Sequence, residues 1–161
     1  MSQLTHFDSE GLPHIVDVGE KQPTQRKAIA SGTITMQPET LEMILQSRVA
    51  KGDVFEVARL AGIMATKRTA DLIPLCHPIS VTSVELKIEP QGERSVEVTS
   101  TVKAVDRTGV EMEALVSIST ALLTIYDMCK SVDRGMTISQ LRLDHKSGGK
   151  SGTFDRDLDQ D

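Results

Sequence analysis

The chain has 161 residues, the usual size of one domain with a single sizeable hydrophobic core. A formal charge of -5 and an aromatic content of 2% argue against nucleic acid as a partner, because a basic footprint and stacking platforms are both missing. No stretch approaches the roughly 18 consecutive apolar residues of a membrane span, and the N-terminus carries no secretion signal, so we expect a soluble cytoplasmic protein without a membrane partner.

The first part of the chain predicts a leader, two strands and a helix. Residues 1–13 are expected to be flexible, and residues 14–18 alternate as in a short strand. Residues 26–36 combine small and β-branched side chains, which predicts a longer strand. A helix then begins at Pro38, because proline is favoured in the first turn.

A break at residues 50–53 separates this helix from a second one. Asp53 is a good N-cap, and the second helix must end by Ile73 because the proline at position 74 disfavours helix before it. Lys51 is therefore expected in an inter-helix loop, directly before a helix N-terminus. Backbone N–H groups attract anions at such a position.

The next elements are strands. Residues 80–89 and 94–105 alternate polar and apolar side chains around the turn at residues 90–92, which predicts a hairpin. Residues 136–143 predict the last strand, and an acidic tail covers residues 153–161. The order of elements indicates an α+β fold, in which helices cover one face of an antiparallel sheet.

Residues 110–134 form the longest predicted helix, with Gly135 as the residue that ends it. Asp127, Lys130 and Arg134 fall within about 60° of one another, roughly opposite the apolar stripe. These side chains predict either a solvated face with an ordinary ion pair or part of a catalytic site.

Glu113 lies within about 40° of Asp127 on the same helical wheel, yet about 20 Å away along the axis. One small molecule cannot contact both residues of one chain. If both are functional, either the helix begins after Glu113 or a symmetric partner chain brings one copy's Glu113 to another's Asp127. This geometry predicts a site between subunits.

Four further side chains cluster before the hairpin. Lys67 and Arg68 lie late in a helix, where basic residues also serve as ordinary complements to the helix dipole. His77, between two prolines, either orients a substrate or is a structural histidine. Cys76 precedes it, but two cysteines and four scattered histidines have no zinc-binding spacing, so we expect no metal site and reduced cysteines.

The segment KSGGKSG, residues 146–152, is similar to a phosphate cradle, since glycines expose backbone N–H groups and its lysines add charge. It is not a P-loop, because Asp144 stands where that motif needs glycine. A flexible linker is the alternative interpretation.

Three blocks together carry a family resemblance: VAKGDVFEVARLAGIMATKRTADLIPLCHP, TGVEMEALVSISTALLTIYDMCK and KSGGKSG. They resemble the molybdenum cofactor biosynthesis protein C family, the cyclic pyranopterin monophosphate synthases. The similarity runs from about His14 to Gly152, so residues 14–152 are expected to form a single catalytic domain.

The resemblance implies a ferredoxin-like subunit in a homohexamer, a trimer of dimers with active sites at the dimer interfaces. It also implies a lyase reaction in which 3′,8-cyclo-7,8-dihydroguanosine 5′-triphosphate becomes cyclic pyranopterin monophosphate and diphosphate. No resident cofactor is implied, and Mg²⁺ can accompany the triphosphate.

The same resemblance assigns catalytic roles to Lys51 as general acid, Lys130 as proton shuttle and Asp127 as the group that holds Lys130. It assigns substrate binding to Leu75, Cys76, His77, Met112, Glu113, Lys67, Arg68, Glu111, Lys146, Arg26 and Asp17. A non-catalytic module that binds a purine nucleotide would use the same cations without proton carriers, and a scaffolding oligomer would bind no purine triphosphate.

Overall fold

The computed structural model describes residues 6–47 and 52–156. In this part of the chain, five strands form one antiparallel sheet in the order β2-β3-β1-β4-β5. The strands are β1 (Thr24–Thr35), β2 (Val81–Gln91), β3 (Ser95–Asp106), β4 (Thr137–Ser147) and β5 (Phe154–Asp155).

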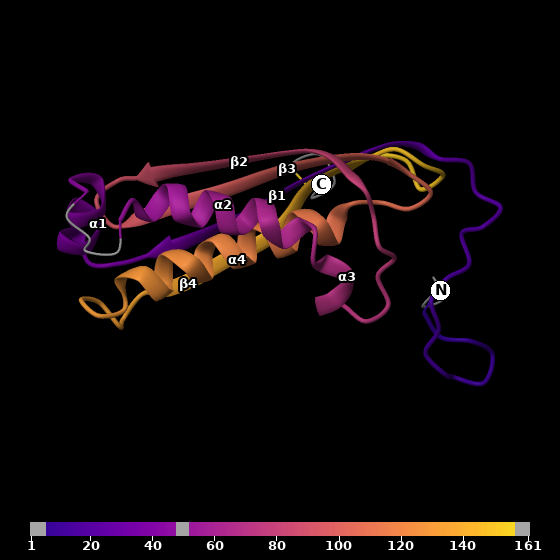
Figure 1. Ribbon diagram of the computed structural model, residues 1–161, viewed down its shortest axis with the longest axis horizontal. Coiled ribbons are helices and arrows are strands. Elements are labelled where there is room, and N and C mark those ends of the chain that lie inside the picture. The colour runs from indigo at the N-terminus through magenta and orange to yellow at the C-terminus, as the bar shows by residue number, and fades with distance from the viewer. Residues whose placement is uncertain (1–5, 48–51, 157–161) are drawn as a thin grey trace.

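The helices are α1 (Pro38–Leu45), α2 (Val54–Thr66), α3 (Thr69–Leu72) and α4 (Glu111–Cys129). Figure 1 shows α2 and α4 side by side along one face of the sheet. Strand β3 lies between β1 and β2, so the crossover through α1 and α2 skips one strand. The predicted α+β ferredoxin-like architecture, with helices on one face of an antiparallel sheet, is confirmed.

Helix α4 supplies the centre of the core. Its Ile118, Leu122 and Ile125 side chains are fully buried, and β3 contributes buried Val98 and Val102 beneath them. The helix is long and apolar enough to cross a membrane, but 56% of its apolar window is buried inside the protein. Its hydropathy is therefore that of a core helix.

Helices α2 and α4 approach each other closely at Gly62. A Cβ atom on Gly62 would lie 2.6 Å from Leu86 Cδ1 and 2.9 Å from the Ser117 carbonyl oxygen. Ser117 belongs to α4 and Leu86 to the strand beneath α2. The absence of a side chain at Gly62 thus lets α2 contact both.

The sheet brings three chain segments together at one end. Thr24 at the start of β1 pairs with Asp106 at the end of β3, and Lys27 pairs with Ser147 at the end of β4. Helix α4 begins only a few residues after Asp106. The loops that leave β3 and β4 therefore meet beside the N-terminus of α4.

The predicted helix starts are confirmed. Pro38 occupies the first turn of α1. Asp53 caps α2, because its Oδ1 accepts hydrogen bonds from the backbone N–H groups of Phe55 and Glu56 at 3.0 and 3.1 Å. As predicted, α2 and the short α3 both end before Ile73.

Two predictions about strands are wrong in position. Residues 14–18 form no strand, and the Val16 carbonyl oxygen accepts a hydrogen bond from the His77 ring. The hairpin turn lies at residues 92–94, not at 90–92. Pro90 remains in β2, since β2 is an edge strand and one of its sides needs no N–H donor.

The predicted end of the long helix is also wrong. Helix α4 ends at Cys129, not at Arg134, and Gly135 is not its terminating residue. Beyond Cys129 the chain turns, and the Arg134 carbonyl accepts a hydrogen bond from the Tyr126 hydroxyl at 3.1 Å. Arg134 consequently does not share a helix face with the residues at positions 127 and 130.

The C-terminal segment adds a short strand to the sheet. Strand β4 extends to Ser147, and the glycine-rich residues that follow turn the chain back so that Phe154 pairs with Lys146. Phe154 and Asp155 of the predicted acidic tail thus belong to the sheet. Residues 146–152 thus lead from β4 back to β5, which pairs with it.

Asp133 links the end of α4 to the start of α1. Its Oδ2 accepts hydrogen bonds from Gln37 N at 2.8 Å and Thr40 Oγ1 at 3.3 Å, and its Oδ1 accepts one from Gly135 N at 3.0 Å. The side chain is buried, with 7% exposure. This carboxylate thus ties the N-cap residue of α1 to the turn that follows α4.

We expect Asp133→Ala to lower the free energy of unfolding by about 1–3 kcal/mol, because buried donors lose their acceptor. Chemical denaturation of both proteins measures the change. Asp8→Ala is the matched control: Asp8 also accepts two backbone N–H bonds, but in an exposed loop. Equal losses in the two variants would contradict a special role for Asp133.

Candidate functional site

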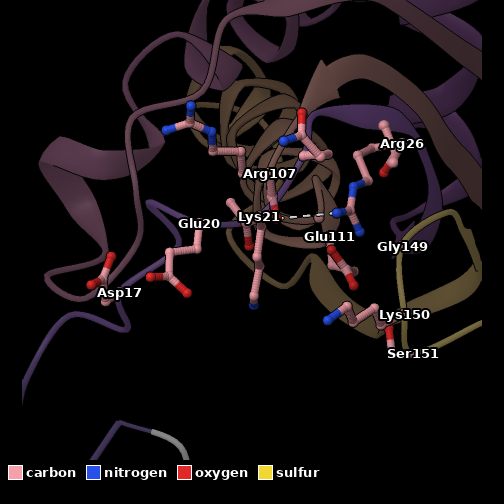
Figure 2. A pocket seen from close by; sticks show the side chains of 13 residues that line it. Asp17, Glu20, Lys21, Arg26, Arg107, Glu111, Gly149, Lys150 and Ser151 are labelled. Atoms are coloured by element: carbon pink, nitrogen blue, oxygen red, sulfur yellow. Dashed lines mark hydrogen bonds between the residues drawn. The ribbon is translucent and has the colours of Figure 1, made fainter.

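A cavity of about 980 Å³ opens at the end of the sheet where the loops meet. Its walls come from residues 17–26, from the loop between β3 and α4, and from the glycine-rich loop after β4. Figure 2 shows Asp17 and Glu20 on one side, and Arg26, Gly149 and Lys150 on the other. The charged side chains that line it are Asp17, Glu20, Lys21, Arg26, Arg107, Glu111 and Lys150.

A smaller cavity, about 220 Å³, adjoins the first and shares Glu111 with it. The turn after α3 and the first turn of α4 face each other across this space. Five predicted substrate-binding residues line it: Leu75, Cys76, His77, Met112 and Glu113. The structure thus places two distant sequence blocks around one cavity.

His77 is held by the N-terminal segment. Its Nε2 lies 2.8 Å from the Val16 carbonyl oxygen. Because a carbonyl only accepts, Nε2 carries the proton, and Nδ1 is left as the acceptor when the ring is neutral. The segment before the sheet therefore fixes the orientation of a histidine in the smaller cavity.

Glu113 is the most unusual ionisable group in the site. Its side chain is 2% exposed, although it lies in the first turn of α4 near Glu111. Burial, reinforced by the charges of Glu111 and Asp106, raises the pKa of Glu113 to about 7. Burial and the Glu113 charge also raise the pKa of the Cys76 thiol. The site thus holds a carboxyl group poised to exchange a proton near neutral pH.

The raised pKa predicts a pH-dependent effect of Glu113→Gln on stability. Between pH 4.5 and about pH 7 the unfolded carboxyl ionises while the folded one stays protonated, so folding loses stability as pH rises. Glutamine does not ionise and escapes this loss. Relative to wild type, we expect the variant to gain up to ~3 kcal/mol in unfolding free energy between pH 4.5 and about pH 8.

Urea unfolding of both proteins at the two pH values, at one protein concentration, measures this difference. Glu89→Gln is the control, since Glu89 is an exposed carboxylate on the edge strand β2. A Glu113→Gln effect that stays constant with pH would contradict an elevated pKa.

Lys146 joins the site from β4. Its Nζ donates a hydrogen bond to Ser151 Oγ and lies 3.9 Å from Glu111 Oε1, with 19% of the side chain exposed. Its partners Glu111 and Ser151 both line the larger cavity. The predicted residues Asp17, Arg26, Glu111 and Lys146 are therefore gathered at the same end of the sheet.

Asp127 and Lys130 lie at the opposite end of α4. Lys130 Nζ is 2.6 Å from Asp127 Oδ1, and the two side chains are 52% and 60% exposed. The predicted pairing is confirmed. Because α4 already begins at Glu111, Glu113 and Asp127 occupy one continuous helix and are separated by about 20 Å along it. One chain cannot bring them to the same small molecule.

Two of the predicted substrate-binding residues lie apart from both cavities. Lys67 and Arg68 are exposed and line neither of them. Arg68 forms an ion pair with Asp71 at 3.4 Å. Lys51 lies outside the described residues. Helix α2, which follows it in sequence, begins at the end of the molecule where α4 ends (Figure 1).

Sequence reasoning missed Lys21 and Arg107 as lining residues of the larger cavity. Lys21 lies in a polar connection before β1, and Arg107 follows β3. Neither belongs to a motif, so only their proximity to the ends of predicted strands could have indicated them. Within residues 6–47 and 52–156, no three His, Cys, Asp or Glu side chains gather in a way that could hold a metal ion.

Comparison with known proteins identifies the family. The model of the MoaC family matches residues 15–149. A cyclic pyranopterin monophosphate synthase of Magnetococcus marinus is 57% identical over 158 residues, which cover 98% of this chain and 97% of the relative. A protein of the same name from Dinoroseobacter shibae is 56% identical over 96% of this chain and 99% of the relative. Another from Pelotomaculum thermopropionicum is 55% identical over 97% of this chain and 92% of the relative. With the loop, helix and cavity residues placed as described, these similarities show that the chain belongs to the MoaC family.

Proposed function

We propose that the chain is a cyclic pyranopterin monophosphate synthase of molybdenum cofactor biosynthesis. It is a lyase that converts 3′,8-cyclo-7,8-dihydroguanosine 5′-triphosphate to cyclic pyranopterin monophosphate and diphosphate. The observation that carries this function is identity above 50% over nearly the whole chain to several synthases of that name. As a biosynthetic enzyme it acts in the cytoplasm, on a substrate derived from guanosine.

The two cavities suit different parts of that substrate. A triphosphate carries about four negative charges, and the larger cavity offers Lys21, Arg26, Arg107 and Lys150 to balance them. The smaller cavity is lined by apolar Leu75, Ile79 and Met112 beside the polar groups of His77 and Glu113, which suits a flat heterocycle with hydrogen-bonding groups on its edges.

The reaction opens the imidazole ring of the purine, closes the pterin ring and expels diphosphate after a ribose-derived hydroxyl attacks the α-phosphate. Each ring step moves protons, so groups that both give and accept them are required. In this proposal Lys51 is the general acid, Lys130 shuttles protons and Asp127 holds Lys130. No resident cofactor takes part, and any Mg²⁺ arrives with the triphosphate.

The assembly that completes the site is a homohexamer built as a trimer of dimers, with each active site at a dimer interface. The separation of Glu113 from Asp127 along α4 supports this arrangement, because only a second copy can unite the two ends. The exposure of the Asp127–Lys130 pair supports it too, since a partner surface would exclude water from that pair.

The outer face of the helices is suited to such contacts. Helix α2 exposes Val57, Leu60 and Met64 at helical spacing, with 43%, 62% and 50% exposure, and α4 exposes Leu123 at 60%. Large apolar side chains gathered on one face are typical of a protein interface. Their proposed occupant is a second copy of the chain, and sedimentation of the purified protein measures the number of copies.

A direct assay tests the function. The purified protein is incubated with the cyclised triphosphate, and cyclic pyranopterin monophosphate and diphosphate are quantified together. Equal amounts of both products support the synthase. A protein that binds the triphosphate without turnover would instead be the non-catalytic nucleotide-binding module, and a protein that binds no purine triphosphate would be a scaffold.

A further inference from the structure

Arg26 differs from the other cavity cations because each nitrogen of its guanidinium donates a hydrogen bond to a backbone carbonyl. Its Nε donates to the Asp106 carbonyl at 3.2 Å, its Nη2 to the Arg107 carbonyl at 3.1 Å and its Nη1 to the Gly148 carbonyl at 3.2 Å. The Nη2 bond to Arg107 is drawn in Figure 2. Three of the five N–H donors of the side chain therefore hold backbone rather than face the cavity.

The glycine pair after β4 is shaped around this guanidinium. A Cβ atom on Gly149 would lie 1.8 Å from Arg26 Nη1, and one on Gly148 would lie 2.0 Å from the Gln25 carbonyl oxygen. Both glycines have positive φ, 76° and 98°. The loop can therefore approach the start of β1 only where side chains are absent.

The two loops that Arg26 holds carry charged groups of the site. The loop from Asp106 leads directly into α4 and Glu111, while the glycine-rich loop lies between Lys146 and Lys150. Lys146 lies 3.9 Å from Glu111 across the junction of these loops. A shift of either loop would change the distances between cations and carboxylates along the whole wall of the cavity.

We propose that Arg26 is a positioning residue, whose three carbonyl bonds fix the loop before α4 against the glycine-rich loop and so set the geometry of the polyanion-binding cavity. The effect of Arg26 on turnover rests on the proposed function. The clamp, by which we mean the three bonds from Arg26 to the carbonyls of Asp106, Arg107 and Gly148, is a property of the fold alone. It revises the expectation that Arg26 serves mainly as a charge for the substrate.

The replacement Arg26→Lys distinguishes the two roles. Lysine keeps the positive charge but has a single nitrogen, which cannot reach three carbonyls in different directions. If Arg26 acts mainly as a charge, the lysine variant keeps most of the activity and Arg26→Gln loses it. If Arg26 is a clamp, both variants lose kcat/KM by about 100-fold, since misplacement of about 1 Å has such an effect.

Hydrogen–deuterium exchange provides a readout that does not require activity. Amides of residues 106–110 and 146–152 should exchange faster in Arg26→Lys, while those in the middle of α4 should stay protected. If both loops of Arg26→Lys exchange at the wild-type rate, Arg26 does not clamp the loops, whatever the turnover of the variant. Faster exchange with unchanged turnover would overturn the positioning role. If the wild-type protein itself does not turn over, the proposed function fails, and the exchange experiment still decides the clamp.

Alanine substitutions at Gly149 and Gly152 provide a second test if the arginine variants fold poorly. Gly149→Ala places a methyl group on Arg26 Nη1, whereas Gly152→Ala has the same kind of positive φ, 71°, but no atom within 4 Å. Both variants carry similar backbone strain. We expect faster loop exchange and lower kcat/KM in Gly149→Ala, and nearly wild-type values in Gly152→Ala. Equal behaviour of the two would contradict the clamp.

Discussion

Two inactive variants should restore each other's activity when they assemble together. Glu113→Gln and Asp127→Asn should each lower kcat by at least about 100-fold, because each removes a proton-handling or positioning group from every site. In a mixed dimer, one of the two sites at the interface receives both defects and the other receives none. Random assembly of equal amounts should therefore restore about a quarter of the wild-type rate.

The expectation depends on the length of α4. If one chain supplied both residues, every site in the mixture would keep one defect, and no rate would return. The two variants should be co-expressed at equal levels, with each variant expressed alone as the control. Oligomers of a single variant should stay inactive. Absence of recovery in a mixed oligomer that sediments normally would contradict the site between subunits.

Lys130→Ala should lower kcat by about 10²–10⁴-fold, the usual contribution of a group that transfers protons in the transition state. The same loss is expected for Lys51→Ala. Substrate affinity should change less, since the cavity cations at the other end of the sheet are intact. Single-turnover kinetics, together with equilibrium dialysis of the triphosphate, separate chemistry from binding.

Lys87→Ala is a matched control for these variants. Lys87 also forms an exposed ion pair, with Glu85 at 3.8 Å, but it lies on the edge strand β2. Its removal should leave turnover near wild type, because a surface pair contributes little to stability. Near wild-type rates in the Lys51 and Lys130 variants as well would reject their role as proton carriers and favour a binding module.

Local sequence signals predicted those parts of the fold that depend on neighbours in the chain. The proline that starts α1 and the cap at Asp53 need only a few adjacent residues, and both predictions are confirmed. The Asp127–Lys130 pair follows in the same way from helical spacing. The family resemblance added the ferredoxin-like architecture, which alternation alone does not determine.

Predictions failed where contacts between distant residues decide the structure. Asp133 bonds to Gln37, which lies far away in sequence, and this contact accompanies the turn that ends α4 early. Glu113 lies within about 40° of exposed Asp127 on the helical wheel, yet it is buried and lines a cavity with the turn that carries Cys76. Helical periodicity describes one helix and carries no information about what packs on it.

The sequence predicted which segments carry the site. It did not predict how these segments are distributed between the two ends of α4. Sequence blocks indicated the turn with His77, the start of α4 and the glycine-rich loop, and the structure gathers these around two cavities. It leaves Lys130 at the far end of α4. The proposed positioning role of Arg26 could not be predicted from the sequence. It depends on three backbone carbonyl groups that only the folded chain brings together.

The close approach at Gly62 limits how this protein can be made more stable. Exchanging an interior helical glycine for alanine commonly raises helix stability by about 1 kcal/mol. Here the added methyl group would meet Leu86 and the backbone of α4 at Ser117. Helix α2 would have to tilt or move away, and its two ends, one near the turn with His77 and one near the end of α4, would move with it. Thermostability is therefore better sought on the exposed edge strand β2 than in the helix layer.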